Sequence, residues 1–299
     1  QRQMCIRDRL GLSNAEMEGL PSEPYDPSPD YFTRRAALCT PLDVTEVYGR
    51  ICAGSLPAIR ALPEDLRSAG YESYLDTYVM RDVRDLAQVG DAPRFRHFMA
   101  VCAALTSRPV VYAELARIAD VSEKTAKTWL SLLVSTYLIK LVEPYSNNLL
   151  KRLSKRPIMH FLDTGLAAYL TGWSNPQALE AGAMSGQIFE TYAFGEVYKG
   201  FANAGRHAPL FFFRSSDGKE IDLLVERDGT LYPIEIKKTA SPSRGDARNL
   251  GALDPVAADD APEGLSVFRR KIGTGCILCM TGDTFPVSDR AWAFPVWAL

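Results

Sequence analysis

Two carboxylates and a lysine near the end of the chain are residue types that metal-assisted phosphate chemistry uses. Asp222 lies thirteen positions before Glu235, and Lys237 lies two positions after Glu235. Carboxylate oxygens suit Mg²⁺ or Mn²⁺, and a bound cation of this kind polarises a phosphoryl oxygen and lowers the pKa of an attacking water. A neighbouring lysine can orient that water or stabilise negative charge on the phosphate. We therefore treat all three as candidate catalytic residues, and the two acids also as candidate metal ligands.

The segments around these residues predict a β-hairpin. Residues 220–226 and 231–237 alternate between polar and apolar side chains, which is the pattern of strands with one buried face. Asp228-Gly229 lies between them and favours the type I′ turn of a two-residue hairpin. With these two residues as the loop, the register is determined, because facing residues have numbers that add up to 457.

This register places the candidate site on one face of the hairpin. Asp222 then lies opposite Glu235, and Glu220 lies opposite Lys237. Two facing carboxylates repel each other unless a cation or a proton lies between them, so a divalent metal would resolve the conflict. The apolar residues of the other face form a predicted core stripe: Ile221, Leu223, Val225, Tyr232, Ile234 and Ile236.

The sequence leaves two questions about this site open: whether Glu190 belongs to it, and whether its polar face is simply exposed to solvent. Glu190, in a predicted helix over residues 186–199, could supply a further acid if that helix packs across the sheet. The polar face could instead be the wet side of an antiparallel hairpin, with Glu220 and Lys237 as a surface ion pair of little energetic consequence.

A helix-turn-helix pattern precedes this region. Residues 112–119 are typical of a short helix, Asp120-Val121 of a turn, and Ser122 of the N-cap of a second helix. The second helix has an apolar stripe made of Ala126, Trp129, Leu130 and Leu133. Its outward face would carry Glu123, Lys124, Lys127, Thr128 and Ser131. Two apolar segments that follow are the predicted strands of a wing: 138–142 and 158–162.

Basic residues are concentrated in the same part of the chain. Residues 108–156 hold nine Lys or Arg against four Asp or Glu, a local charge of +5, whereas the whole chain has a net charge of −2. Cationic side chains gain affinity for nucleic acid by releasing condensed counterions, so DNA is a candidate partner. A module that only packs or contacts protein is the alternative, because a charge run is usually a solvated face. The candidate nucleic-acid contacts are Lys124, Lys127, Thr128, Lys151 and Arg152.

Length and composition set the class of protein. The 299 residues are 46% hydrophobic and 23% charged, which is typical of a folded globular chain and excludes a collagen-like or disordered one. Turn-rich stretches suggest three regions, 1–90, 91–156 and 157–299, and we predict a mixed α/β fold. No window holds the roughly 18 apolar residues of a membrane span, so no membrane is expected as a partner. Six scattered cysteines and a start without an export signal predict a reducing cytoplasm.

A family resemblance is carried by Asp222, Glu235 and Lys237, which look like the D…ExK core of the restriction-endonuclease-like PD-(D/E)xK superfamily. Ile221 stands where the name of that superfamily has proline. The chain resembles more closely the C-terminal part of uncharacterised bacterial and archaeal AAA-family ATP-binding proteins, whose C-terminal domain of unknown function follows a winged helix. The matching strings are residues 74–83 (YLDTYVMRDV), 160–166 (HFLDTGL), 189–192 (FETY), 220–222 (EID) and 234–237 (IEIK).

The resemblance implies an architecture and a function. Residues 1–90 would be the helical remnant of an ATPase region, 91–156 a winged helix, and 157–299 a restriction-endonuclease-like domain. The two acids of the motif would hold Mg²⁺ or Mn²⁺, and the lysine and Glu190 would complete a nuclease site for nucleic-acid phosphodiesters. The alternative is a noncatalytic platform that is attached to the ATPase and binds DNA or a partner protein.

Members of that family carry a nucleotide-binding P-loop near their N-terminus, and this sequence has none. Its Gly218-Lys219 pair is followed by Glu220 inside the predicted hairpin rather than by the hydroxyl residue of a P-loop. We therefore expect ATP binding only in an intact parent protein that includes the N-terminal ATPase core. The string from Met4 to Arg9 also resembles the broken ends of environmental gene predictions, so we expect a fragment whose first residues are not native.

Overall fold

The computed structural model describes residues 10–79, 91–146, 156–173, 175–215, 218–253 and 270–299. Its helices and a mixed sheet of ten strands form the α/β fold that the sequence predicts. The chain divides into two compact units, each built from three stretches. The first unit holds Gln1–Leu12, Tyr48–Leu141 and Ile158–Gly195, and the second holds Ser13–Val47, Val142–Pro157 and Glu196–Leu299. None of the described helices has the length and apolarity needed to cross a bilayer.

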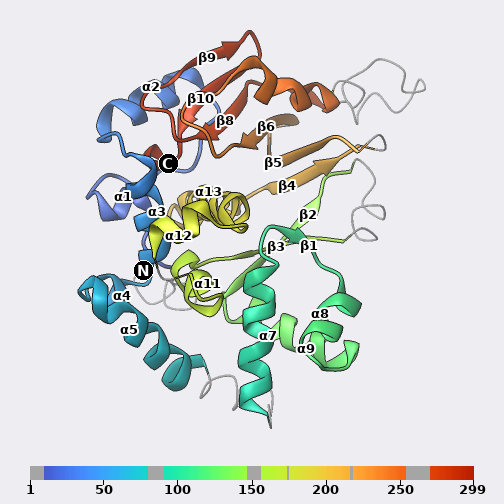
Figure 1. Ribbon diagram of the computed structural model, residues 1–299. Helices are drawn as coiled ribbons and strands as arrows, with labels where there is room; N and C mark the ends of the chain where they lie inside the picture. Colours follow the sequence, from blue (N-terminus) through green and yellow to red (C-terminus); the bar gives the residue numbers. More distant parts are fainter. Residues whose placement is uncertain (1–9, 80–90, 147–155, 174, 216–217, 254–269) are drawn as a thin grey trace. The chain divides into compact units, whose positions relative to one another are not determined.

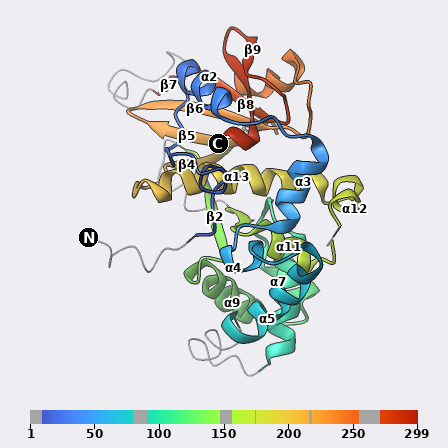
Figure 2. The same ribbon diagram turned by 90° about the vertical axis from the view of Figure 1, so that its left-hand side faces the viewer.

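The first unit is mainly helical, and within it α11 packs beside α7 (Figure 2). Its complete helices are α4 (Pro57–Arg60), α5 (Arg67–Tyr74), α7 (Ala92–Ala104), α8 (Tyr112–Ile118), α9 (Glu123–Ser135), α11 (Thr164–Leu170) and α12 (Pro176–Ala181). It also holds η2 (Glu64–Leu66), the π-helical η3 (Leu75–Val79), most of α3 (Val44–Ala53) and the first part of α13 (Ser185–Asn203).

The helix-turn-helix prediction is confirmed. Between α8 and α9 the backbone of Asp120 takes a left-handed φ of 53°, which turns the chain. Ser122 caps α9, because its Oγ accepts a hydrogen bond from the amide of Thr125 at 3.0 Å. The predicted apolar stripe of α9 is buried, and Trp129 packs edge-on against Phe95 of α7 with ring centroids 5.2 Å apart.

Strands follow this pair of helices as predicted. The two wing segments are present as β2 (Ile139–Pro144) and β3 (Ile158–Phe161), which are neighbours in the sheet. The short β1 (Arg108–Pro109) pairs antiparallel with β3. His160 on β3 is buried, where its ring stacks on Phe194 of α13 at a centroid distance of 4.2 Å.

The second unit is built on the larger part of the sheet, in which the strands follow the order β2-β4-β5-β6-β8-β10-β9 (Figure 1). Strand β7 pairs with β6. Neighbours β4, β5 and β6 are antiparallel, β6, β8 and β10 are parallel, and β9 is antiparallel to β10. The strands are β4 (Leu210–Arg214), β5 (Glu220–Arg227), β6 (Thr230–Ile236), β7 (Lys271–Ile272), β8 (Gly275–Cys279), β9 (Phe285–Ser288) and β10 (Ala291–Pro295). The helices are α1 (Asn14–Met17), α2 (Pro29–Leu38), η4 (Arg244–Leu253) and η6 (Val296–Ala298).

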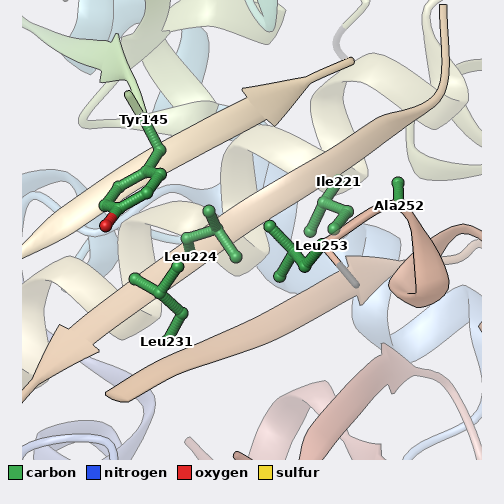
Figure 3. Packing of buried hydrophobic residues seen from close by; sticks show 6 residues of the cluster. All are labelled: Tyr145, Ile221, Leu224, Leu231, Ala252 and Leu253. Atoms are coloured by element: carbon green, nitrogen blue, oxygen red, sulfur yellow. The ribbon is translucent and has the colours of Figure 1, made fainter. Parts of the chain in front are cut away.

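A β-bulge in β5 changes which side chains share a face. Against β4, Leu224 lies opposite Phe211 and Ile221 lies opposite Phe213, so β5 has one extra residue between these pairs. Ile221 and Leu224 therefore pack in the same buried cluster, whose other members are Tyr145, Leu231, Ala252 and Leu253 (Figure 3). Ile221 is buried as predicted, but the expectation that it shares a face with Leu223 and Val225 is wrong, because a strict alternation cannot include a bulge.

Candidate functional site

The hairpin has the turn and the register that the sequence predicts. Asp228 and Gly229 have φ values of 50° and 73°, as a type I′ turn requires. Every pair of the β5–β6 ladder obeys the predicted sum, from Leu223 opposite Ile234 to the last pair before the turn. The turn sequence and the register are therefore confirmed for this part of the hairpin.

Beyond the end of this ladder, side-chain hydrogen bonds connect the two strands. Oδ2 of Asp222 accepts a hydrogen bond from the backbone amide of Ile236 at 2.7 Å. Nζ of Lys237 lies 3.3 Å from the same Oδ2 and 2.5 Å from Oε2 of Glu235. The lysine thus bridges two carboxylates from neighbouring strands, and the three candidate catalytic residues lie together.

Glu235 is the buried member of this cluster. Its side chain is 0% exposed, and within the described residues its Oε1 has no hydrogen-bond partner. Burial raises the pKa of this carboxyl to about 8, with a further contribution from the negative charge of Asp222, while Lys237 acts in the opposite direction. The proton of Glu235 can therefore be removed near neutral pH by any group that compensates the charge.

Lys237 keeps its positive charge. Burial by itself would lower the pKa of the ammonium group, but the charges of Asp222 and Glu235 outweigh burial and raise it. Its side chain is 32% exposed and that of Asp222 is 19% exposed, so solvent reaches the site from the side of these two residues. The interpretation of this face as the wet side of the hairpin is wrong, because Glu235 and its neighbour Leu231 on the same face of β6 are both buried.

The donor set fits Mg²⁺ or Mn²⁺ in part. Asp222 and Glu235 offer hard carboxylate oxygens, and Oε1 of Glu235 is a buried acceptor to which none of the described residues donates. Among the described residues no group of three or more His, Cys, Asp or Glu side chains is gathered as metal ligands are. Mg²⁺ commonly uses one or two carboxylates and keeps several waters, so two acids satisfy the requirement of this ion but not that of a closed protein site.

The two other acids of the prediction are Glu220 and Glu190. Glu220 forms its ion pair with Arg214 on β4 rather than with Lys237, because β5 pairs with β4 here and Lys237 lies beyond the end of β6. The expected Glu220 and Lys237 pair is therefore wrong. Glu190 lies on α13 in the first unit, and its role at the site stays a prediction.

Asp246 is an acid near the site that the sequence motif does not include. It lies in η4, and its Oδ2 accepts hydrogen bonds from the amide and the hydroxyl of Ser243, both at 2.8 Å. These hydrogen bonds lower the pKa of Asp246, and the positive charge of Lys237 adds to that effect. The Ser-x-x-Asp spacing of a capping box is the sequence signal that could have identified it.

The basic surface of the helix-turn-helix has the predicted exposure. Lys124, Lys127 and Thr128 are all exposed on α9. Nζ of Lys127 lies 5.3 Å above the ring of Tyr112 on α8, a cation–π contact that leaves the ammonium at the surface. Lys151 and Arg152 lie outside the described residues.

A buried carboxylate in the first unit was part of a matching string but had no predicted role. Asp163 caps α11 by accepting the amide hydrogen of Leu166 at 2.6 Å, and its other oxygen accepts the amide of Ser55 at 2.6 Å and the amide of Leu56 at 3.1 Å. The hydroxyl of Tyr71 donates to it at 2.9 Å. Asp163 therefore ties α11 to the loop before α4 and to α5, and this role is structural.

Comparison with known proteins gives two family matches and distant relatives. A domain of unknown function (DUF8612) matches residues 45–177, and a second domain of unknown function (DUF4143) matches residues 185–299. Uncharacterised proteins of Mycobacterium bovis and Mycobacterium tuberculosis are each 30% identical to this chain over 190 residues. The match covers 64% of this chain and 42% of each relative. No solved structure matches the chain.

Proposed function

We propose that Asp222, Glu235 and Lys237 form a PD-(D/E)xK-type site that cleaves nucleic-acid phosphodiesters with Mg²⁺ or Mn²⁺. The observation that carries the proposal is the Glu235 carboxylate. It is buried, one of its oxygens has no hydrogen-bond partner in the described part of the chain, and a second carboxylate lies beside it. An unsatisfied buried acceptor destabilises the fold, and such groups with strongly perturbed pKa values are concentrated at functional sites.

The roles of the three residues follow from their positions and charges. Asp222 and Glu235 would hold the cation, which when bound polarises a phosphoryl oxygen and makes a water more acidic. Glu235 must give up its proton to act as a ligand, and its pKa of about 8 makes that proton removable near neutral pH. Lys237, whose pKa is raised, remains a charged donor that orients water or stabilises negative charge on the phosphate, and is not a base.

We further propose that the chain acts as part of a protein that also has an AAA-type ATPase core, with ATP bound by that core. Two matches to domains of unknown function and relatives of which only 42% is covered are compatible with this arrangement. The resemblance of the matching strings is the support for it.

The decisive test is calorimetric titration of Mn²⁺ and Mg²⁺ into the wild-type chain and into Asp222→Asn. Wild type should bind, more tightly at about pH 8.5 than at about pH 6.5 because the Glu235 proton competes with the metal. Asp222→Asn should lose binding, and Glu220→Gln, a carboxylate on the same strand paired with Arg214, should keep it. A folded wild type that binds no metal in the millimolar range contradicts the proposal.

A noncatalytic platform that binds DNA through the helix-turn-helix is a second candidate. The exposed Lys124, Lys127 and Thr128 on α9 favour it, because they present a basic surface next to a well-formed turn. It predicts salt-sensitive DNA binding without cleavage in the presence of Mn²⁺, whereas the nuclease predicts cleavage that Asp222→Asn and Lys237→Ala abolish.

A further inference from the structure

Three half-buried arginines lie on consecutive helices of the first unit. Arg50 is on α3, Arg60 ends α4, and Arg67 begins α5. The positive charges of Arg67 and Arg50 both act on Arg60, so both lie close enough to repel its guanidinium group. Positive charge is therefore concentrated around Arg60.

Contacts around Gly54 bring together the segments that carry the three arginines. Nη1 of Arg60 donates a hydrogen bond to the carbonyl of Gly54 at 3.0 Å, and the amide of Gly54 donates to the carbonyl of Arg50 at 3.0 Å. A Cβ on Gly54 would clash with the hydroxyl of Tyr71. Tyr71 lies four residues after Arg67 on α5, which places both on the same face of that helix. All three arginines thus belong to segments that meet at Gly54.

Asp163, a carboxylate at this junction, does not neutralise Arg60 or Arg67. Asp163 contacts Tyr71, but its two oxygens accept hydrogen bonds from Tyr71, Leu166, Leu56 and both donors of Ser55. Within the described part of the chain neither Arg60 nor Arg67 forms an ion pair, and Nε of Arg67 is buried without an acceptor.

Burying a positive charge without a counterion raises the free energy of the folded state, and the lowered pKa of Arg60 reflects this. Burial lowers the pKa of this guanidinium, and the charges of Arg67 and Arg50 lower it further. A bound anion would reverse both effects. Guanidinium groups present planar pairs of donors whose spacing matches phosphate oxygens, and charge-assisted hydrogen bonds of this kind are among the stronger ones.

We propose that Arg50, Arg60 and Arg67 form an anion site whose ligand is a phosphate group, either free phosphate or the phosphate of a nucleotide. The site lies in the first unit and involves none of the residues of the carboxylate cluster, so it does not depend on the proposed nuclease function. Nε of Arg67, which is buried and has no acceptor among the residues that the structure describes, is the donor that marks where the anion would be held.

The test is a titration of the whole chain with sodium phosphate, pyrophosphate or ADP at constant ionic strength, followed by thermal unfolding. A ligand that binds only the folded state raises the unfolding temperature in a saturable way, which sodium chloride at equal ionic strength would not do. An equal response to phosphate and ADP identifies free phosphate as sufficient, whereas a response to ADP alone identifies a nucleotide.

Variants separate a ligand site from a structural role. Arg67→Gln should weaken phosphate binding about tenfold or more, and Arg67→Lys, which keeps the charge and loses the planar fork, should weaken it less. Arg117→Gln, an exposed arginine of α8 in the same unit, is the matched control and should bind like wild type.

The stability of the ligand-free protein gives the second readout. Arg67→Gln should leave the unfolding temperature in phosphate-free buffer unchanged or raise it, because one repelling charge is removed. A lowered temperature would assign Arg67 to the fold and contradict the proposal. Wild type without a saturable response to any of the three anions, or Arg67→Gln with a wild-type response, would also overturn it.

Discussion

Lys237 and Glu235 share a contact that neutralises only half of a carboxylate. Nζ of Lys237 lies 2.5 Å from Oε2 of Glu235, while Oε1 of the same group is buried and has no partner in the described structure. The lysine is also 3.3 Å from Asp222, so one cation serves two acids. The arrangement leaves one negative charge uncompensated when both acids are ionised. Burial is the main cause of the raised pKa of Glu235, and the negative charge of Asp222 adds to it.

The raised pKa of Glu235 predicts that the free energy of unfolding falls as the pH rises. A carboxyl whose pKa is raised on folding holds its proton more tightly in the folded state. Its contribution is complete below its ordinary pKa of 4.5 and is lost as the pH rises through about 8. Without metal, wild type should lose up to about 1.4 kcal/mol of unfolding free energy per pH unit within this window.

Glu235→Gln should flatten that dependence, because the amide cannot ionise. Urea unfolding at intervals from about pH 5 to about pH 9, with Glu220→Gln as the matched control, measures it. Parallel curves for wild type and Glu235→Gln would show that the buried carboxyl does not titrate in this range.

His160 predicts a dependence of the opposite sign. Burial against Phe194 lowers the pKa of its imidazole to about 3, so the folded state excludes a proton that the unfolded chain accepts below 6.5. The stabilisation present above pH 6.5 should therefore fall as the pH drops toward 3, by about 2 kcal/mol at pH 5. His160→Phe keeps a ring beside Phe194 and should be less acid-sensitive in urea unfolding at pH 7 and pH 5, whereas an equal loss in both proteins would exclude His160 as the source.

Asp163 should be among the residues on which folding of the first unit depends most. Asp163→Ala leaves the buried amides of Ser55 and Leu166 without acceptors and frees the hydroxyl of Tyr71. We expect a loss of more than about 3 kcal/mol of unfolding free energy in chemical denaturation. Glu123→Gln, an exposed acid of α9, should change stability by less than about 0.5 kcal/mol. A loss for Asp163→Ala no larger than this control would contradict the bridging role.

The basic surface of α9 predicts how DNA affinity depends on salt. If Lys124 and Lys127 each contact a phosphate, changing both to Ala should reduce the slope of log affinity against log salt by about 1.8. Fluorescence anisotropy with a duplex at several salt concentrations measures this slope. Arg206→Ala, an exposed cation in the second unit, should leave it unchanged. An unaltered slope in the double variant would remove α9 from the interface.

Local features of the carboxylate site could be predicted because they depend on neighbouring residues. Asp228-Gly229 tolerates the left-handed backbone of a type I′ turn, and a two-residue loop leaves only one register, so the pairing of β5 with β6 follows. The spacing of Asp222, Glu235 and Lys237 then brings them to neighbouring strands. The helix-turn-helix was predictable for the same reason, from a cap at Ser122 and a helical stripe.

The environment of these residues depended on contacts that no local pattern contains. The bulge in β5 forms against β4, and it moves Ile221 into the cluster of Leu224 and Leu253. Packing of η4 on β5 and β6 covers a face of the hairpin that the alternation of polar and apolar residues alone would leave exposed to solvent. The turn, the register and the identity of the acids therefore follow from the order of the residues alone. The burial of Glu235 and the contact of Lys237 with both carboxylates follow from the folded chain, because burial and charge pairing depend on which distant segments pack together.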